Sequence, residues 1–209
     1  MKSLFRNIAL RFTRRIYHSI LQIQAERQEQ EKQWLLSEFK SCGSNFYIGR
    51  FCHIGGPWRM SIGDSFSAGD HLRLETLDRF EQQHFQPQLI IGNNVRIEDN
   101  CHIGCIERVE IGDGTLLASK VFISDHSHGN VDKSDIDVAP LSRPLVSKPV
   151  KIGRNVWIGD GACILPGVEL GDNVVVGANA VVTHNFPANA VIAGCPARLI
   201  RMLDAKANQ

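Results

Sequence analysis

Residues 152–181 consist of the consecutive rows IGRNVW, IGDGAC, ILPGVE, LGDNVV and VGANAV, and this stretch decides the fold. Every row begins with an aliphatic residue, and a glycine usually follows it. The same pattern occurs upstream in the rows IGRFCH from Ile48, IGNNVR from Ile91 and IGDGTL from Ile111. A repeat of six residues, each beginning with an aliphatic side chain, predicts short strands. These strands would stack on one another in successive coils. We therefore expect an all-β parallel β-helix over residues 44–191.

The residue type at each place in the row supports this fold. The aliphatic residue at place one must point inward, and place five is mostly small, as at Val156, so that a narrow interior can hold both. Glycine at place two indicates a corner that needs either freedom in φ or a close approach of two backbones. Asp, Asn, Gly or Ser at places three and four suit turns. Three rows make one coil of about 18 residues, which predicts that Ile152 stacks on Leu170 and Ile158 on Val176.

Two segments interrupt the repeat, at residues 78–88 and 129–151. Counting the rows in threes places Ile103 and Ile123 on one face, and both interruptions follow that face. Both loops therefore leave the same edge of a rigid prism, which is where we expect function. Three prolines in the second loop predict an extended arm rather than a packed element.

Residues 1–43 form a different segment. They lack glycine and proline before the Cys-Gly pair at their end, and apolar residues recur every three or four positions from Phe5 to Ile23. This spacing predicts an amphipathic helix, and its beginning is basic without acidic residues. One interpretation packs the apolar stripe on the prism or on a sister subunit, and we favour it because Trp34 also needs burial. The other places residues 1–23 on an anionic membrane surface.

Composition excludes several classes of protein. The 209 residues fit one domain with an appendage, and 43% hydrophobic and 22% charged residues are typical of a globular chain. A net charge of +1 argues against a nucleic-acid partner. Six cysteines occur without a CxxC pair, and Cys52 and Cys101 fall at the small inward place five. Arginines interrupt any signal-peptide core, so we expect reduced thiols and a cytoplasmic protein, with peripheral attachment at the inner membrane face under the second interpretation of the helix.

The segment SDHSHG, residues 124–129, lies at the mouth of the second loop. A histidine that is mostly neutral near pH 7 suits a general base for a hydroxyl group, and His126 is the candidate. Asp125 or a backbone carbonyl would fix its tautomer, and His128 would shape the pocket. The alternative is a corner histidine that only hydrogen-bonds the loop.

The repeat and several flanking segments resemble the left-handed β-helix acyltransferase superfamily. The segments are 102–106, 124–129, 148–159, 182–187 and 193–198. They are most similar to galactoside, maltose and xenobiotic acetyltransferases and to O-acetyltransferases of bacterial lipopolysaccharide and capsule clusters. The resemblance covers roughly residues 44–203. It implies a left-handed coil and a homotrimer with active sites between subunits. We also expect a short helix in the tail, residues 192–209.

The resemblance further implies acetyl-CoA as the acyl donor, with no metal required. Trp157 would form one wall of the groove that binds the acyl and pantetheine groups. The residues implied along the pantetheine arm are Gly159, Asp160, Gly177 and Ala178, and those at the nucleotide end are Thr183, Arg198 and Arg201, where arginine would pair with phosphate. Relatives often have Ser or Gly at the place of Asp160 and Lys at the place of His184, so these two contacts depart from the family pattern.

The implied reaction is direct transfer of an acetyl group within a ternary complex. His126 would take the proton of a sugar hydroxyl while the oxygen attacks the thioester, and a backbone N–H would stabilise the oxyanion. The acceptor would belong to bacterial surface polysaccharide biosynthesis. The candidates on the acceptor side are Glu75, Asn100, His102, Asp125 and His128. Arg73 and His102 occupy equivalent places in their rows, so we expect them to lie near each other.

Three other functions stay open on the sequence. The first is N-acetylation of an amino sugar or small amine, since nothing in the residues distinguishes oxygen from nitrogen. The second is a metal lyase similar to γ-type carbonic anhydrases, for which His102, His126 and His128 would supply the ligands. The third is a non-catalytic scaffold. The segment around Trp157 and the tail around Arg198 favour coenzyme A over a metal.

Overall fold

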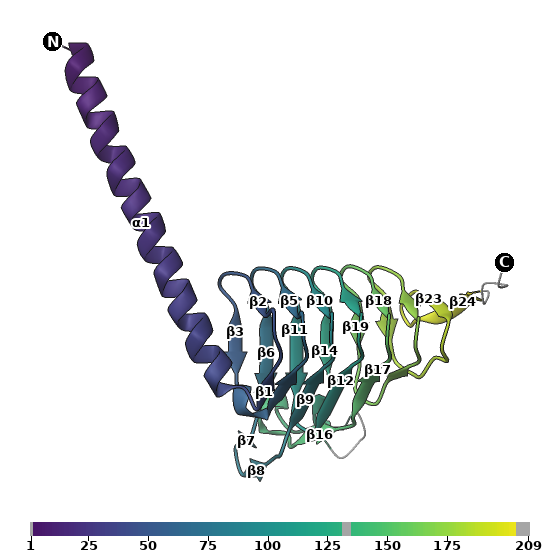
Figure 1. The fold of residues 1–209 in the computed structure, drawn as a ribbon. Helices are drawn as coiled ribbons and strands as arrows, with labels where there is room; N and C mark the ends of the chain where they lie inside the picture. Colours follow the sequence, from purple (N-terminus) through teal and green to yellow (C-terminus); the bar gives the residue numbers. More distant parts are fainter. Residues whose placement is uncertain (1, 131–134, 204–209) are drawn as a thin grey trace. The chain divides into compact units, whose positions relative to one another are not determined.

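The structure is a computed structural model that describes residues 2–130 and 135–203. It contains two units, helix α1 (Lys2–Glu38) and a β-helical unit that begins at Phe39 (Figure 1). Helix α1 ends earlier than the Cys42-Gly43 pair suggests, because Ser41 and Cys42 already pair with a neighbouring strand as β1. None of the helices in the described part of the chain is long and apolar enough to cross a bilayer.

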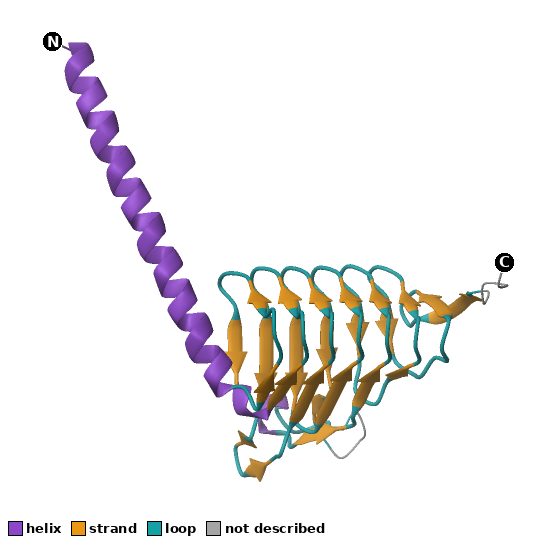
Figure 2. Cartoon of the chain, in the orientation of Figure 1, coloured by secondary structure: helices purple, strands orange, loops and turns teal. Residues whose placement is uncertain are grey.

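Three sheets of short strands form the walls of the β-helical unit (Figures 1 and 2). The first sheet contains β1 (Ser41–Cys42), β4 (Met60–Ile62), β9 (Gln88–Ile91), β12 (Arg108–Ile111), β17 (Val150–Ile152) and β20 (Glu169–Leu170). The second contains β2 (Tyr47–Ile48), β5 (Ser67–Ala68), β10 (Arg96–Ile97), β13 (Leu116–Leu117), β18 (Trp157–Ile158), β21 (Val175–Val176), β23 (Ala190–Ala193) and β24 (Arg198–Met202). The third contains β3 (His53–Gly55), β6 (Arg73–Thr76), β11 (His102–Cys105), β14 (Phe122–Ser124), β19 (Cys163–Ile164) and β22 (Val181–Val182).

The predicted stacking of rows is confirmed. The in-register parallel pairs include Ile152 with Leu170, Ile158 with Val176, and Ile103 with Ile123. Arg73 and His102 are direct neighbours on the third sheet, as their equivalent places predicted. The chain therefore visits the three sheets in turn, and each row contributes one strand and one corner.

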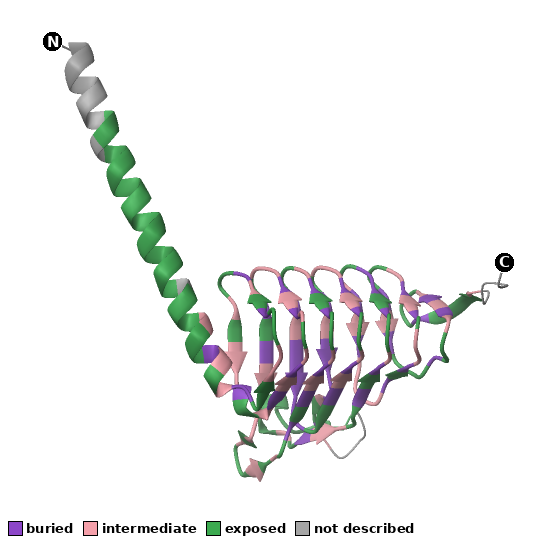
Figure 3. Ribbon diagram, viewed as in Figure 1, coloured by how far each residue is buried: buried purple, intermediate pink, exposed green. Residues whose placement is uncertain are grey.

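Aliphatic side chains from places one and five fill the interior of the coil. Ile103, Leu117 and Ile158 are completely buried, and so is Ala162 at place five. Figure 3 shows this as buried bands that recur from strand to strand along the walls. Cys101 follows the same rule, and burial raises the pKa of its thiol to about 11. All six cysteines are free thiols.

The corners explain why the row needs glycine at place two. A Cβ on Gly153 would lie 2.6 Å from the carbonyl carbon of Gly171 in the next coil, so close approach is the reason for glycine there. Positive φ occurs instead at place four, as at Asn155 (54°) and Asn173 (60°). Place three supplies hydrogen bonds between coils, because the Asp172 carboxylate accepts the N–H of Arg154 at 2.7 Å.

Two hairpins stand where the sequence predicted loops. Within residues 78–88, β7 (Arg79–Phe80) pairs with β8 (Gln83–His84). The second loop begins as β15 (His126–His128), which pairs antiparallel with β16 (Leu145–Ser147). The arm is thus more regular than predicted at its base, while its residues 131–134 lie outside the described part. Short 3₁₀ turns occur at Pro57–Arg59 and Pro140–Ser142.

The prediction of a C-terminal helix is wrong over the described residues. Arg198–Met202 form strand β24, which pairs antiparallel with β23. β23 would otherwise end the second sheet with unpaired backbone N–H and C=O groups, and β24 satisfies them. Residues 204–209 of the predicted tail lie outside the description.

Candidate active site

A buried carboxylate and a histidine form the centre of the candidate site. β14 ends at Ser124, Asp125 makes the corner, and His126 begins β15. The Asp125 carboxylate is fully buried, and its Oδ1 lies 2.9 Å from Nδ1 of His126, whose side chain is 17% exposed. A neutral His126 therefore donates from Nδ1 to the carboxylate and keeps the lone pair of Nε2 for a substrate proton.

Three backbone groups hold this carboxylate in place. The N–H groups of Ile106, Glu107 and Arg108 donate to Asp125 at 2.8–3.1 Å. Burial opposes the ionisation of Asp125. The hydrogen bonds from His126 and the backbone outweigh burial and lower the pKa of Asp125 below its ordinary value. Asp125 is thus a fixed negative charge that orients His126.

A change of spacing creates this group of N–H donors. Ile103 and Ile111 begin successive rows but lie eight positions apart, whereas Ile152 and Ile158 lie six apart. The two additional residues widen the corner between β11 and β12, and the widened corner turns its N–H groups toward Asp125. The eight-residue spacing can be read from the sequence. That the widened corner binds a carboxylate depends on Asp125, which lies in the next coil.

Small groups leave room for the His126 ring. Ser124 Oγ lies 3.3 Å from Nδ1 of His126 and donates to the His126 carbonyl at 3.0 Å. On the neighbouring strand, a Cβ added to Gly104 would lie only 3.1 Å from Cε1 of His126. The ring therefore lies against a residue that has no side chain.

Replacing Gly104 with alanine is expected to lower kcat by about tenfold, because the added methyl group moves the His126 ring out of its position. The fold should persist, since φ of Gly104 is not positive and its other contacts are ordinary. Steady-state kinetics with circular dichroism would measure both effects. Gly55, the equivalent residue of β3, is the matched control because its added Cβ meets nothing closer than 3.5 Å. Equal losses in both variants would contradict this role of Gly104.

A second cluster surrounds Glu75 on the outer face of the third sheet. Oε2 of Glu75 lies 2.8 Å from Nε of Arg73 and 3.3 Å from Nε2 of His102. Oε1 of Glu75 lies 3.4 Å from Nε2 of His53. Burial disfavours the charge of Glu75, but Arg73 and then His102 outweigh burial and lower its pKa. Burial and the charge of Arg73 lower the pKa of His102, which keeps that ring neutral near pH 7.

This cluster adjoins the His126 dyad. Glu75 and Ser124 both pair in register with Gly104 from opposite sides. An added Cβ on Gly104 would meet His126 at 3.1 Å and Nε2 of His102 at 3.8 Å. The structure therefore brings together four of the predicted residues, Glu75, His102, Asp125 and His126.

The two hairpins support the strand that carries His126. The side-chain amide of Gln83 accepts the N–H of Leu145 at 2.6 Å and donates to its carbonyl at 3.1 Å. Phe80 packs edge to face on His128 with ring centroids 5.4 Å apart. His128 is exposed and contacts the first hairpin rather than the dyad. The two interruptions of the repeat are thus joined in space at one edge, as the row count predicted.

The residues implied for coenzyme A form a separate group. Trp157 is 52% exposed on the second sheet. It lies in one row with Val175, Val191 and Arg201 on successive strands. Gly159, Asp160, Gly177 and Ala178 occupy adjacent corners that lead into the third sheet, and an added Cβ on Gly159 would lie 2.7 Å from the N of Ala178. Thr183 is exposed beyond β22, and Arg198 is exposed at the start of β24.

Within one chain the pantetheine corners do not converge with the dyad. The corner of Gly159 and Asp160 precedes β19, whereas His126 follows β14, and these two strands pair in parallel. These corners and the dyad therefore lie at opposite ends of the third-sheet strands, whereas Thr183 follows β22 and lies at the end that carries His126. Asn100, at a corner that precedes β11, lies at the coenzyme A end and is not part of the Glu75 cluster.

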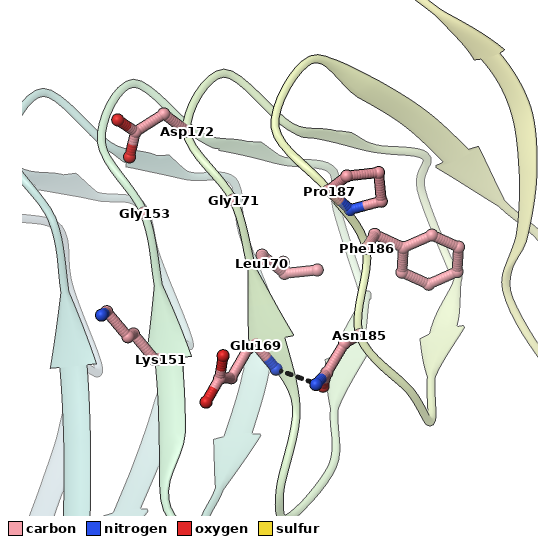
Figure 4. Close-up of a pocket in the computed structure, with 9 residues that line it drawn as sticks. All are labelled: Lys151, Gly153, Glu169, Leu170, Gly171, Asp172, Asn185, Phe186 and Pro187. Atoms are coloured by element: carbon pink, nitrogen blue, oxygen red, sulfur yellow. Dashed lines mark hydrogen bonds between the residues drawn. The ribbon is translucent and has the colours of Figure 1, made fainter.

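A hollow of about 480 Å³ lies elsewhere on the surface, on the first sheet (Figure 4). Its lining includes Lys151, Glu169, Asp172, Asn185 and Phe186. Asn185 accepts the N–H of Glu169 at 2.7 Å, which joins its two walls. None of the predicted site residues lines it, so we do not assign the chemistry to it.

Comparison with known proteins identifies the relatives of this chain. The family of bacterial transferase hexapeptide repeats (six repeats) matches residues 149–184. WbbJ of Escherichia coli K12, named for O-acetyl transfer in lipopolysaccharide biosynthesis, is 42% identical over 162 residues, which cover 75% of this chain and 79% of WbbJ. The chain belongs to the hexapeptide-repeat acyltransferases.

Solved structures agree with this assignment. A galactoside acetyltransferase in complex with coenzyme A is 28% identical, with a TM-score of 0.56 over 84% of this acyltransferase and 71% of that chain. AntD, an N-acyltransferase from Bacillus cereus, shares the fold with a TM-score of 0.67 at 22% identity, over 86% of this chain and 90% of AntD. The shared fold agrees with the family assignment, and the galactoside acetyltransferase holds coenzyme A.

Several site residues of the acyltransferase could not be found from the sequence. Gly104, Ser124 and Gln83 owe their places to strand pairing across 20 or more residues or to the hairpin contact. Among the described residues, no group of His, Cys, Asp and Glu side chains is arranged to hold a metal ion. That the reaction needs no metal remains a prediction.

Proposed function

We propose that this acyltransferase transfers the acetyl group of acetyl-CoA to a sugar hydroxyl in the biosynthesis of a bacterial surface polysaccharide. The observation that carries the proposal is the Asp125–His126 dyad beside the Glu75 cluster on the third sheet. The names of WbbJ and of the galactoside acetyltransferase support an oxygen acceptor on a carbohydrate. A cytoplasmic reaction is part of this proposal, because acetyl-CoA is the proposed donor.

His126 acts as the general base in this mechanism. Its Nε2 takes the proton of the acceptor hydroxyl while the oxygen attacks the thioester carbonyl carbon. A backbone N–H stabilises the oxyanion of the tetrahedral intermediate. The C–S bond then breaks, and the thiolate of coenzyme A receives the proton from His126, which returns to its neutral form. Asp125 stabilises the imidazolium while the proton resides there.

The separation of the pantetheine corners from the His126 dyad within one chain supports a site shared between subunits. One subunit would hold coenzyme A through Trp157, Gly159, Asp160, Gly177, Ala178, Thr183, Arg198 and Arg201. His126 of a neighbouring subunit would then approach the thioester. We propose a homotrimer with a left-handed coil, for which the family resemblance is the support.

Glu75 and His102 would bind the acceptor. Glu75 is ionised and its side chain is 16% exposed, so it can accept hydrogen bonds from hydroxyl groups next to the reacting one. His102 is neutral and lies between Glu75 and the dyad. Asp125 acts through His126, and His128 borders the pocket through Phe80.

Replacing Glu75 with glutamine is expected to raise the KM for the acceptor by about 10- to 100-fold, because a charge-assisted hydrogen bond becomes a neutral one. The KM for acetyl-CoA should stay the same, since the partners of Glu75 are His53, Arg73 and His102 and none of the residues assigned to coenzyme A. Initial rates with each substrate varied in turn would measure both constants. Glu98→Gln is the matched control, because Glu98 pairs with Arg96 on the second sheet. A rise in KM for acetyl-CoA instead would contradict the assignment to the acceptor side.

The direct test of the proposed function is a transfer assay. Purified protein would be incubated with acetyl-CoA and either neutral or amino oligosaccharides and nucleotide sugars, with release of the thiol and mass of the product followed together. We expect a gain of one acetyl ester on a hydroxyl. Acetylation of amines alone would replace the proposal by N-acetyl transfer. Activity that depends on stoichiometric bound metal would argue against His126 as a free base.

A further inference from the structure

The first half of helix α1 has a charge distribution unlike the rest of the chain. No acidic residue occurs before Glu26, whereas lysine or arginine occurs at positions 2, 6, 11, 14 and 15. The second half of the helix is mixed and contains ion pairs such as Arg27 with Glu31 at 2.8 Å. The cationic charge is therefore concentrated in one stretch of a continuous 37-residue helix.

The same stretch divides into an apolar and a basic face. With about 100° between successive residues, Ile16, Ile20 and Ile23 fall on one strip, and Tyr17 and Leu21 fall beside it. Arg11, Arg15 and His18 occupy the opposite side by the same spacing, and Arg14 lies at the border of the apolar face beside Leu10 and Tyr17. The apolar face, which also contains Thr13, spans roughly 160° of the helix circumference, wider than the narrow seam of a coiled coil.

The apolar face is exposed. Leu10, Ile16, Tyr17, Ile20, Leu21 and Ile23 are 42–64% exposed. Exposed large apolar side chains in a continuous strip indicate a surface that another apolar medium covers. A second copy of the helix is a poor candidate, because the apolar face is wider than a coiled-coil seam and a sister helix offers no negative charge to the arginines.

We propose that residues 10–23 of α1 bind the surface of an anionic lipid bilayer. The apolar face enters the boundary between headgroups and acyl chains, and Arg11, Arg14 and Arg15 reach up to the lipid phosphates. The helix lies in the plane of the interface and does not span the bilayer. This inference is independent of the proposed chemistry of the β-helical unit.

Sedimentation with vesicles tests the proposal on the full chain. Phosphatidylcholine vesicles with and without phosphatidylglycerol would be compared at low and high salt. We expect binding that requires phosphatidylglycerol and weakens with salt. The double variant Arg14→Glu with Arg15→Glu should lower the partition coefficient by tenfold or more. Ile16→Ser with Ile20→Ser should do the same through the apolar face.

The matched control reverses two charges in the second half of the same helix. Arg27→Glu with Lys32→Glu changes the net charge by the same amount and should keep binding within about twofold. Acetyl transfer to a soluble acceptor should be unchanged in all these variants, which separates loss of membrane binding from loss of fold or of the proposed function.

Three results would overturn the proposal. The first is failure of the wild-type chain to bind anionic vesicles, and the second is equal loss of binding in the control and the Arg14/Arg15 variant. The third is a lower oligomeric mass of the Ile16/Ile20 variant in light scattering without lipid, together with vesicle binding that is the same in the wild type and the Arg14/Arg15 variant. That outcome would assign the apolar face to contact between copies of the chain.

Discussion

Alanine in place of His126 is expected to lower kcat by about 10²- to 10⁴-fold, the usual contribution of a positioned general base. The hydroxyl proton would then have only solvent to receive it. Binding of coenzyme A should be unaffected, because His126 contacts Ser124 and Asp125 and none of the residues assigned to coenzyme A. Release of the free thiol would give kcat, and calorimetric titration with coenzyme A would give the affinity.

His128→Ala is the matched control for this variant. His128 lies on the same short strand two residues further on, is exposed, and contacts Phe80 rather than Asp125. It should change kcat by no more than a few-fold. If the His126 variant kept its turnover, or if both variants lost equal activity, the assignment of the base would be wrong.

Asparagine in place of Asp125 is expected to lower both activity and stability. The carboxylate now accepts three backbone N–H groups and Nδ1 of His126. A single amide oxygen cannot accept all four, and each buried donor left without an acceptor costs about 1–3 kcal/mol. His126 would also lose the charge that sets its tautomer, so kcat should fall by about 10²-fold or more. Urea unfolding and steady-state kinetics measure the two effects.

A partly exposed corner residue provides the comparison for Asp125. Asp172 also accepts a backbone N–H from the neighbouring coil, that of Arg154, but it stands in contact with solvent. Asp172→Asn should leave kcat unchanged and should cost less stability than Asp125→Asn. Equal losses of stability would show that burial of the donors is not the cause.

The pH dependence of stability gives an independent check. The pKa of Asp125 is lower in the folded chain than in the unfolded chain, where it is about 3.9. Its contribution is therefore complete above that unfolded value and disappears as pH falls through the lower folded value. The difference in unfolding free energy between the wild type and Asp125→Asn should shrink as pH falls below about 4. A difference that stays constant between neutral and strongly acidic pH would contradict this role.

Much of the fold was predictable because the repeat is local. The place of a residue in its six-residue row determines whether it points inward, forms the corner or forms the turn. Counting rows in threes therefore predicts that Ile152 stacks on Leu170. The position of both loops at one edge followed from the same count. The segment Arg198–Met202 was not predictable in this way, because its strand forms only in response to the open edge of β23.

The sequence by itself determined the β-helix, the edge from which both loops leave, and His126 as the candidate base, because periodic spacing and residue type are properties of the chain alone. Only the tertiary structure decided how that base is held. Asp125 meets N–H groups of residues 106–108 in the preceding coil, and Glu75 meets His53 and His102 from two different coils. These contacts join residues about one coil apart, so strand stacking alone brings them within hydrogen-bond distance.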